Sequence, residues 1–407
     1  MYNLRLAFKN IFRNRTRSLI TLGAIAFGCI SLIIAGGFME DIFFKLRESY
    51  IHSFLGHMQV YRKGFFEKGA ARPFDFMISD PVAVEKRILS VEHVRLVAPR
   101  LEFSGLLSTG DTTVSFIGQG ISPHEEKELS NFLFISSGEN LSGGDPYGII
   151  LGKGLARSIN AKPGDPLVIL TNTKGGAINA LDVTVKGVFY TASKAFDDRA
   201  VRLPIGTAQK LLHTDDVQTL VVLLDRTDNT GAVMKNLSAM FKKDGLDLEI
   251  KPWYELADFY NKTVALYKRQ FMVLKIIIAI VVVLSVFNTM NMSVLERVGE
   301  VGTIMALGTK KRTVVALFIT EGLILGAIGG IIGLAGGYLL ASVISYVGIP
   351  MPPPPGSTAS WTAQVKVVPG VFLYAFVLAI ATSAVSSFYP AFKASRLEIA
   401  EALRHNI

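Results

Sequence analysis

Residue types that carry catalysis or hold metals are sparse and widely spaced in this chain. The segment GIILGKG, residues 148–154, resembles a phosphate-binding loop, but its spacing differs from the P-loop pattern and no Ser or Thr follows Lys153. We expect a turn and a helix start there instead. The six histidines are scattered, and His52 and His57, five apart, do not share a helical face. The sequence therefore predicts no catalytic site and no metal site, and a chain that is not itself an enzyme.

A single acid and a set of glycines stand out in the apolar part of the sequence. Glu321 lies about two turns into the third predicted span (313–346), where an acid is costly and usually faces a partner or water. A proton relay would need a second acid or histidine, and none accompanies it, so we expect a hydrogen-bonded structural role. Glycines at every fourth position let helices approach closely in lipid. The predicted helix-packing residues are Gly326, Gly329, Gly330, Gly333, Gly337 and Glu321.

Four long uncharged runs place these residues in a membrane protein. Half of the residues are hydrophobic, and a helix of roughly 20 apolar residues can cross a bilayer core. The four runs extend from Leu19 to Met39, Ile276 to Leu295, Gly322 to Val365 and Val367 to Phe392. The sequence thus predicts four transmembrane helices.

The distribution of charge predicts the orientation of these helices. The net charge is +9, but acidic and basic residues are equal in number between Leu19 and Leu274, so the excess indicates no nucleic-acid surface. Basic residues gather before the first run, in the loop after the second and in the tail. The positive-inside rule then places both termini and that loop in the cytoplasm of a multi-pass inner-membrane protein, and the long segment between the first two runs outside.

The segment between the first two runs has the sequence pattern of a mixed α+β domain. Short β-type runs such as DPLVIL and LDVTVKGVFY alternate with helical stretches and turn residues. Cys29, the only cysteine, lies in the first run, so the domain has no disulfide. A cleaved signal is the alternative reading of that run, but it continues to Met39, beyond the 7–15 residues typical of a signal. An apolar stripe with helical spacing continues beyond the first run towards a stop at Gly56, and a similar stripe begins at Trp253 and leads into the second run. The two stripes predict a helical stalk.

The loop ERVGEVGTIMALGTKKR, residues 296–312, has the pattern of an amphipathic helix. Val298, Val301, Ile304 and Met305 share one face, and Gly308 is a natural stop. Such a helix rests on lipid or docks into a partner. Acids come early here and the basic cluster follows the glycine, a distribution that favours docking.

Several segments of the sequence resemble the permease subunits of MacB/LolC/LolE/FtsX-type ABC transporters. The resemblance is carried by NIFRNRTRS before the first run, VFNTMNMSVLERVGEVGTIMALGTKKR, ITEGLILGAIGG and the ending YPAFKASRLEIAEALR. The outer segments GIILGKGLARSINAKPGDPLVIL and VKGVFYTASKAFDDRAVRLPIGTAQKLL are also similar. Together they cover nearly the whole chain.

The resemblance implies a one-plus-three arrangement of spans, a MacB-like periplasmic core domain and mechanotransmission from a cytoplasmic ABC ATPase dimer. It implies no cofactor in this chain, since ATP and Mg would be bound by a separate ATPase. Further implied partners are a second permease subunit, identical or related, membrane lipid, and a periplasmic lipoprotein carrier or adaptor. The loop after the second span would be the coupling helix. The expected ATPase-coupling residues are Glu296, Arg297, Glu300, Val301, Ile304 and Gly308.

The architecture resembles that of the lipoprotein-releasing LolC/LolE permeases, which implies extraction of lipoproteins or lipids from the outer leaflet of the inner membrane. MacB-like export of peptides or drugs through an adaptor, and FtsX-like signalling to a cell-wall hydrolase, are the alternatives. Large apolar residues at the outer end of the first span could receive acyl chains or simply pack the stalk. The candidate cleft residues are Phe38, Met39, Phe43, Phe44 and Phe54.

These inferences together predict an integral membrane α-helical protein with four transmembrane helices and a large α+β extracytoplasmic domain on a helical stalk. The expected parts are a cytoplasmic basic segment (1–17), span one with its stalk extension (18–57), the core domain (58–251), stalk and span two (252–294), the coupling loop (295–312), span three (313–346), an extracytoplasmic Pro-rich loop (347–367), span four (368–390) and a cytoplasmic tail (391–407).

Overall fold

The structure is a computed structural model that describes residues 7, 13, 15–69, 72–130, 133–191, 193–351, 361–396 and 398. The chain divides into two compact units. The helical unit comprises residues 1–44, 263–350 and 362–407, and the sheet unit comprises residues 45–262 and 351–361. Most of the predicted basic segment and tail, and the proline run, lie outside the described residues.

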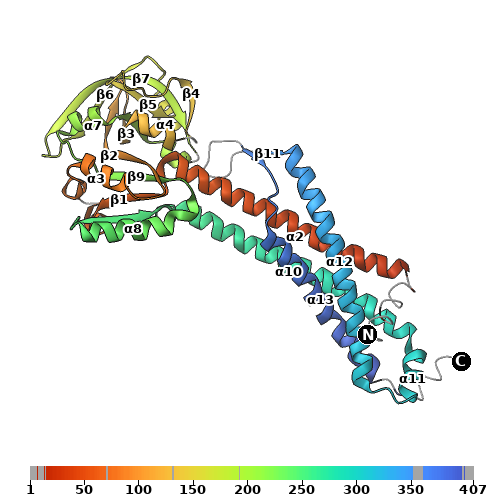
Figure 1. Cartoon of the computed structure of the whole chain (residues 1–407). Coiled ribbons are helices and arrows are strands. Elements are labelled where there is room, and N and C mark those ends of the chain that lie inside the picture. The colour runs from red at the N-terminus through yellow and green to blue at the C-terminus, as the bar shows by residue number, and fades with distance from the viewer. Residues whose placement is uncertain are drawn as a thin grey trace. The chain divides into compact units, whose positions relative to one another are not determined.

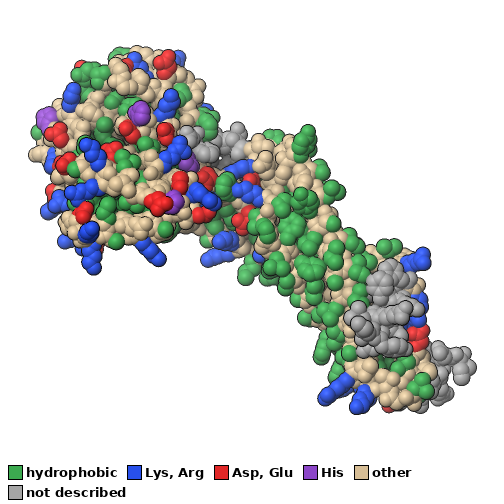
Figure 2. All heavy atoms as spheres, viewed as in Figure 1, with side chains coloured by type: hydrophobic (Ala, Val, Ile, Leu, Met, Phe, Trp, Pro, Cys, Tyr) green, Lys and Arg blue, Asp and Glu red, His purple; other side chains and the backbone are tan. Residues whose placement is uncertain are grey.

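Four long helices of the chain have the length and composition of membrane spans, as the sequence predicts. Charged side chains are scattered over the sheet unit, whereas hydrophobic side chains cover much of the visible face of the helices (Figure 2). The helices are α2 (Arg15–Tyr50), α10 (Asp258–Glu296), α12 (Lys311–Val347) and α13 (Pro369–Ser395), with the short α11 (Val298–Ala306) between the second and third (Figure 1).

Two rows of glycines on α12 let two neighbouring helices approach closely. A Cβ added at Gly326 would lie 2.9 Å from Cβ of Ser383 on α13, and one at Gly329 would lie 2.9 Å from Cβ of Ile25 on α2. Gly322 and Gly330 continue the first row, and Gly333 and Gly337 continue the second. The two rows therefore face different neighbouring helices, α13 and α2.

The helix boundaries differ from the prediction at two places. The predicted continuous helix from Trp253 is interrupted, because α9 (Trp253–Leu256) ends at Ala257, whose φ of −91° and ψ of 59° are not helical. Trp253 and Ala257 are buried in one apolar cluster, so tertiary packing fixes this break where periodicity shows none. At the other end of the chain, α13 passes through Pro390 to Ser395, since Ala391 and Ala394 are buried in the core of the helical unit.

The first helix ends as predicted. After α2 the chain makes one π-helical turn, η1 (Ile51–Leu55), and Gly56 follows with φ +64°, a conformation that favours glycine.

The sheet unit is built on a ten-stranded mixed sheet in the order β10-β1-β9-β2-β3-β8-β5-β7-β4, with β6 paired to β2 and β7. The strands are β1 (Met58–Arg62), β2 (Val94–Ser108), β3 (Thr113–Ile121), β4 (Phe134–Gly138), β5 (Gly148–Gly152), β6 (Pro166–Asn172), β7 (Ile178–Tyr190), β8 (Ala200–Pro204), β9 (Thr219–Leu224) and β10 (Leu248–Pro252).

The two largest apolar cores of the sheet unit lie along this sheet. One packs α3 (Pro81–Leu89) and α8 (Thr230–Lys243) against β1 and β9, and the other packs α7 (Ile205–Leu212) among the remaining strands (Figure 1). Shorter helices α4 (Pro123–Leu129), α5 (Lys153–Ser158) and α6 (Lys194–Asp197) connect strands. The segment that resembles a phosphate loop is strand β5 running into α5, so the predicted helix start at Lys153 is confirmed.

Candidate functional site

The predicted coupling loop forms the short helix α11. The chain leaves α10 at Glu296, turns at Arg297 and ends α11 at Ala306. Gly308 has φ +93°, and its N–H donates to Met305 O at 3.0 Å, so the glycine stops the helix as predicted.

The faces of α11 are used differently from the prediction. Val301 and Met305 are buried in the chain's own core with Val314 and Phe318, because α11 folds back against the ends of α10 and α12. The prediction that Val301 lies on a docking face is therefore wrong. Leu307, which the sequence did not single out, is 83 % exposed, and Ile304 is 37 % exposed.

Arg297, one of the expected coupling residues, is buried within the chain's own structure. It is 5 % exposed. Its Nη1 lies 2.7 Å from Oε1 of Glu321, and its guanidinium lies 5.1 Å from the ring centre of Phe318. Glu321 is 3 % exposed and thus has the structural hydrogen-bonded role that the sequence predicts. The partner of Glu321 is Arg297, in the loop between the second and third spans. The helical periodicity of the third span could not indicate this pairing.

Two further ion pairs connect the N-terminal segment to this loop. Arg13 pairs with Glu300 at 2.6 Å, and Arg17 pairs with Glu296 at 2.7 Å. Burial alone would raise the pKa of Glu300, but the hydrogen bonds and charges of Arg13 and Arg297 outweigh it and lower that pKa. In the sequence, Arg13 and Arg17 served only to predict the membrane orientation of the first span. Their pairing with residues nearly 300 positions away leaves no local signal in the sequence. Together with the Arg297–Glu321 pair, these ion pairs connect the N-terminal segment and α2 with the end of α10, with α11 and with α12.

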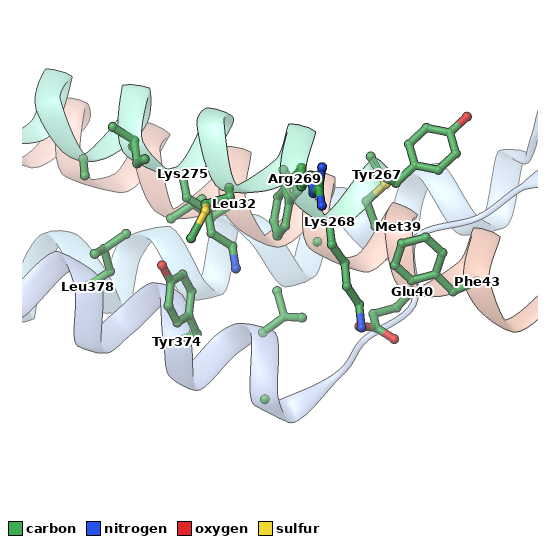
Figure 3. A pocket seen from close by; sticks show the side chains of 17 residues that line it. Leu32, Met39, Glu40, Phe43, Tyr267, Lys268, Arg269, Lys275, Tyr374 and Leu378 are labelled. Carbon is green, nitrogen blue, oxygen red and sulfur yellow. The ribbon is translucent and has the colours of Figure 1, made fainter. Parts of the chain in front are cut away.

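A second candidate site is a cavity of about 790 Å³ bounded by α2, α10 and α13. Figure 3 shows the side chains that surround it. Its wall is mostly apolar, with a few charged residues. The lining consists of Leu32, Gly36, Met39, Glu40, Phe43, Tyr267, Lys268, Arg269, Phe271, Met272, Lys275, Ile276, Ala279, Gly370, Val371, Tyr374 and Leu378.

Only part of the predicted cleft lines this cavity. Met39 and Phe43 do, since residues four apart lie on one face of α2. Phe38 and Phe44 are not among the lining residues, because a step of one residue turns the side chain by about 100°. The Nζ of Lys366 instead lies over the ring of Phe44, 2.9 Å from the ring centre. Phe54 belongs to the sheet unit, where it stacks on Phe196, so the five residues do not form one cleft.

Sequence reasoning missed the contribution of α10 and α13 to the cavity. The signal that could have found it is Lys275, a lone cation between FMVL and IIIAIVVVL.

A buried cluster in the sheet unit holds the end of the first helix. Arg100 on β2 donates to the carbonyl of Phe54, and Arg202 on β8 donates to the carbonyl of Ser53 at 3.2 Å. Both arginines pair with Glu126, at 2.7 and 3.0 Å. Burial, only partly offset by Glu126, lowers the pKa of Arg202 to about 10. Cations suit the negative end of a helix dipole, so the cluster caps η1.

No group of three metal-ligating side chains is assembled in the part of the chain that the structure describes.

Comparison with known proteins identifies the family. Residues 18–240 match the MacB-like periplasmic core domain, and residues 272–399 match the FtsX-like permease C-terminal domain. An uncharacterized ABC transporter permease of Methanocaldococcus jannaschii is 24% identical over 98% of this chain and 96% of its own length. The lipoprotein-releasing system transmembrane protein LolC of Xylella fastidiosa is 24% identical over 76% of this chain and 77% of its own.

A third relative is longer than this chain. The macrolide export ATP-binding/permease protein MacB of Sodalis glossinidius is 27% identical over 98% of this chain, which spans 60% of that protein. Among solved structures, the periplasmic region of MacB from Actinobacillus actinomycetemcomitans superposes with a TM-score of 0.37 at 15% identity, over 50% of this chain and 92% of that one. The core-domain match covers more than half of the sequence. The chain belongs to the FtsX/MacB-type family of ABC transporter permeases.

Proposed function

We propose that this chain is the permease subunit of an ATP-driven complex that extracts lipoproteins or lipids from the outer leaflet of the inner membrane. The observation that carries the proposal is the 790 Å³ apolar cavity bounded by three candidate spans. Cavities of this size and lining bind drug-sized apolar ligands, and each buried CH₂ contributes about 0.8 kcal/mol. The similarity to LolC along most of both chains supports the same substrate class.

The ATPase belongs to a separate cytoplasmic subunit in this proposal, which binds ATP and Mg as a dimer under two permease chains. The positive-inside rule puts α11 on the side of that ATPase. Leu307 and Ile304 form the apolar contact, since they are the exposed large apolar residues of the helix and its end. Val301 and Arg297 act indirectly by holding α11 on α12.

A mechanical step connects the two ends of the permease. The helix α2 runs from Arg15 to Tyr50 without a break, and Arg100 and Arg202 hold the carbonyls of the turn that follows it. Movement of α11 would thus reach the core domain through this helix rather than by opening a channel.

MacB-like export is the second candidate function, favoured by the match to MacB over 98% of this chain. It predicts an adaptor as partner, and no lipidated cargo.

The test is ATP-dependent release of a lipoprotein from proteoliposomes that contain the chain and its copurified ATPase. Leu307→Asp should reduce coupled ATP hydrolysis and release by tenfold or more, because burying a leucine contributes about 1.5–3 kcal/mol and 1.4 kcal/mol is a factor of ten. Thr303→Asp is the matched control, since it adds the same charge to α11 without removing apolar surface. Release that persists in Leu307→Asp would refute the docking assignment, and ATP-independent or absent release by the wild type would refute the function.

A further inference from the structure

Lys275 is an unusual residue for its place in the chain. It lies in an apolar stretch of α10, where Val273 and Ile277, which are outside the cavity lining, are 57 % and 52 % exposed, as lipid-facing residues of a span are. It directly precedes the uncharged run Ile276–Leu295, at the end of the second span. Ionisable residues in transmembrane segments are rare and usually mark a site that binds a ligand or an ion. In the described ranges Lys275 makes no salt bridge.

Two aromatic rings hold the Lys275 ammonium at the cavity. Its Nζ lies 4.6 Å from the ring centre of Phe271 and 4.3 Å from that of Tyr374, which comes from α13. Cation–π contacts of this kind stabilise an ammonium in an apolar setting but do not neutralise its charge. Figure 3 shows Lys275 and Tyr374 among the lining side chains. The cavity wall therefore carries a fixed positive charge.

The rest of the wall extends this pattern. Lys268 and Arg269 line the cavity about two turns earlier on α10, roughly 10 Å away at 1.5 Å per residue. Glu40 on α2 is the one acid in the lining. Three cations and one anion leave an excess of positive charge beside an apolar wall, so the complementary ligand is an amphiphile with an anionic head.

The aromatic faces distinguish between lipid head groups. A quaternary ammonium head would bind best over Phe271 and Tyr374, but Lys275 already occupies both rings. A choline group would also be repelled by Lys275. A phosphate with no accompanying cation instead gains a charge-assisted hydrogen bond to the ammonium.

We propose that this cavity binds an anionic phospholipid, with an acyl chain along the apolar wall and the phosphate at Lys275. The inference deepens the proposed function, on which it rests for the transport of such a ligand, but lipid binding itself requires no ATP.

The test is native mass spectrometry of the purified, delipidated full chain, titrated with phosphatidylglycerol and with phosphatidylcholine of the same acyl chains. The wild type should bind phosphatidylglycerol about tenfold more tightly, the factor that corresponds to about 1.4 kcal/mol. Lys275→Met should abolish this preference. Lys262→Met is the matched control, because Lys262 is an exposed lysine on the same helix outside the cavity lining, and it should retain the preference.

A second pair of variants tests the cavity itself. A Cβ at Gly370, in the lining, meets no atom within 4 Å, so Gly370→Phe should fold and obstruct the cavity, with loss of both lipids. Gly23→Phe, at an equally open position on α2 outside the lining, should bind both as the wild type does.

Equal binding of the two lipids, a preference that survives Lys275→Met, or lipid binding unchanged by Gly370→Phe would overturn the inference. If these results appear while ATP-driven lipoprotein release persists, the inference fails alone. If the preference is present and release is absent, the proposed function fails and the lipid site stands.

Discussion

Removing the charge of Glu321 should destabilise the helical unit more than removing the charge of an exposed ion pair of the same type. Arg297 and Glu321 are 2.7 Å apart, and their side chains are 5% and 4% exposed. Loss of one partner of such a pair leaves the other charge buried and uncompensated, which costs about 3–5 kcal/mol. Glu321→Gln should therefore lower the free energy of unfolding by about 3 kcal/mol, because Glu300 remains as a second partner of Arg297 at 3.2 Å.

The pair of Arg13 and Glu300 is the internal control. Its atoms are 2.6 Å apart, but both side chains are 48% exposed. Exposed pairs contribute about 0–1 kcal/mol, so Arg13→Gln should have a small effect.

The assay is SDS-induced unfolding of the purified protein in mixed micelles, followed by circular dichroism, with a double-mutant cycle on residues 297 and 321. The double variant Arg297→Met with Glu321→Leu should cost less than the sum of the two single changes, since neither charge is left alone. Additive effects, or a Glu321→Gln effect as small as that of Arg13→Gln, would refute the reasoning that burial makes this pair structural.

Three further predictions concern other parts of the chain. Gly333→Leu should prevent close packing of α12 on α2, because a Cβ there would lie 3.0 Å from the carbonyl oxygen of Ala26. The midpoint of thermal unfolding should fall by several degrees, and an unchanged midpoint would contradict the close approach. Burial, and then the charge of His52, lowers the pKa of His57 from its usual 6.5 to about 4, so the folded state keeps this ring neutral. The free energy of unfolding should therefore fall by up to about 3 kcal/mol as the pH drops from 6.5 towards 4, because the unfolded state binds the proton first. A His57→Gln variant with the same pH dependence would argue against this origin. Glu126→Gln should cost about 3–5 kcal/mol in unfolding experiments, because it removes the carboxylate that pairs with two buried arginines. A change within about 1 kcal/mol would rule out that role.

Much of the fold follows from local signals in the sequence. Uncharged runs predict the four spans, Gly56 and Gly308 predict helix ends, and the glycine spacing predicts close packing of α12. Each of these features depends on the chemistry of a few consecutive residues, which periodicity and turn propensity report directly.

The candidate sites follow from the sequence only in part, because they are made by residues far apart in the chain. Periodicity identifies an apolar face of α11, but it cannot tell that Val301 packs inward. The pairing of Arg297 with Glu321 and the contribution of Tyr374 to the cavity depend on how helices pack against one another. Lys275, a cation directly beside the apolar run of the second span, was a usable signal for the cavity.

The most direct test of the central claim is a reconstitution. The full chain is purified in mild detergent with the ATPase that copurifies with it, and placed in proteoliposomes that carry a fluorescent acylated lipoprotein. We predict release that requires ATP and is reduced at least tenfold by Leu307→Asp but not by Thr303→Asp. Release that is the same without ATP, or no copurifying ATPase, would contradict the account of this chain as the permease of an ATP-driven extraction complex.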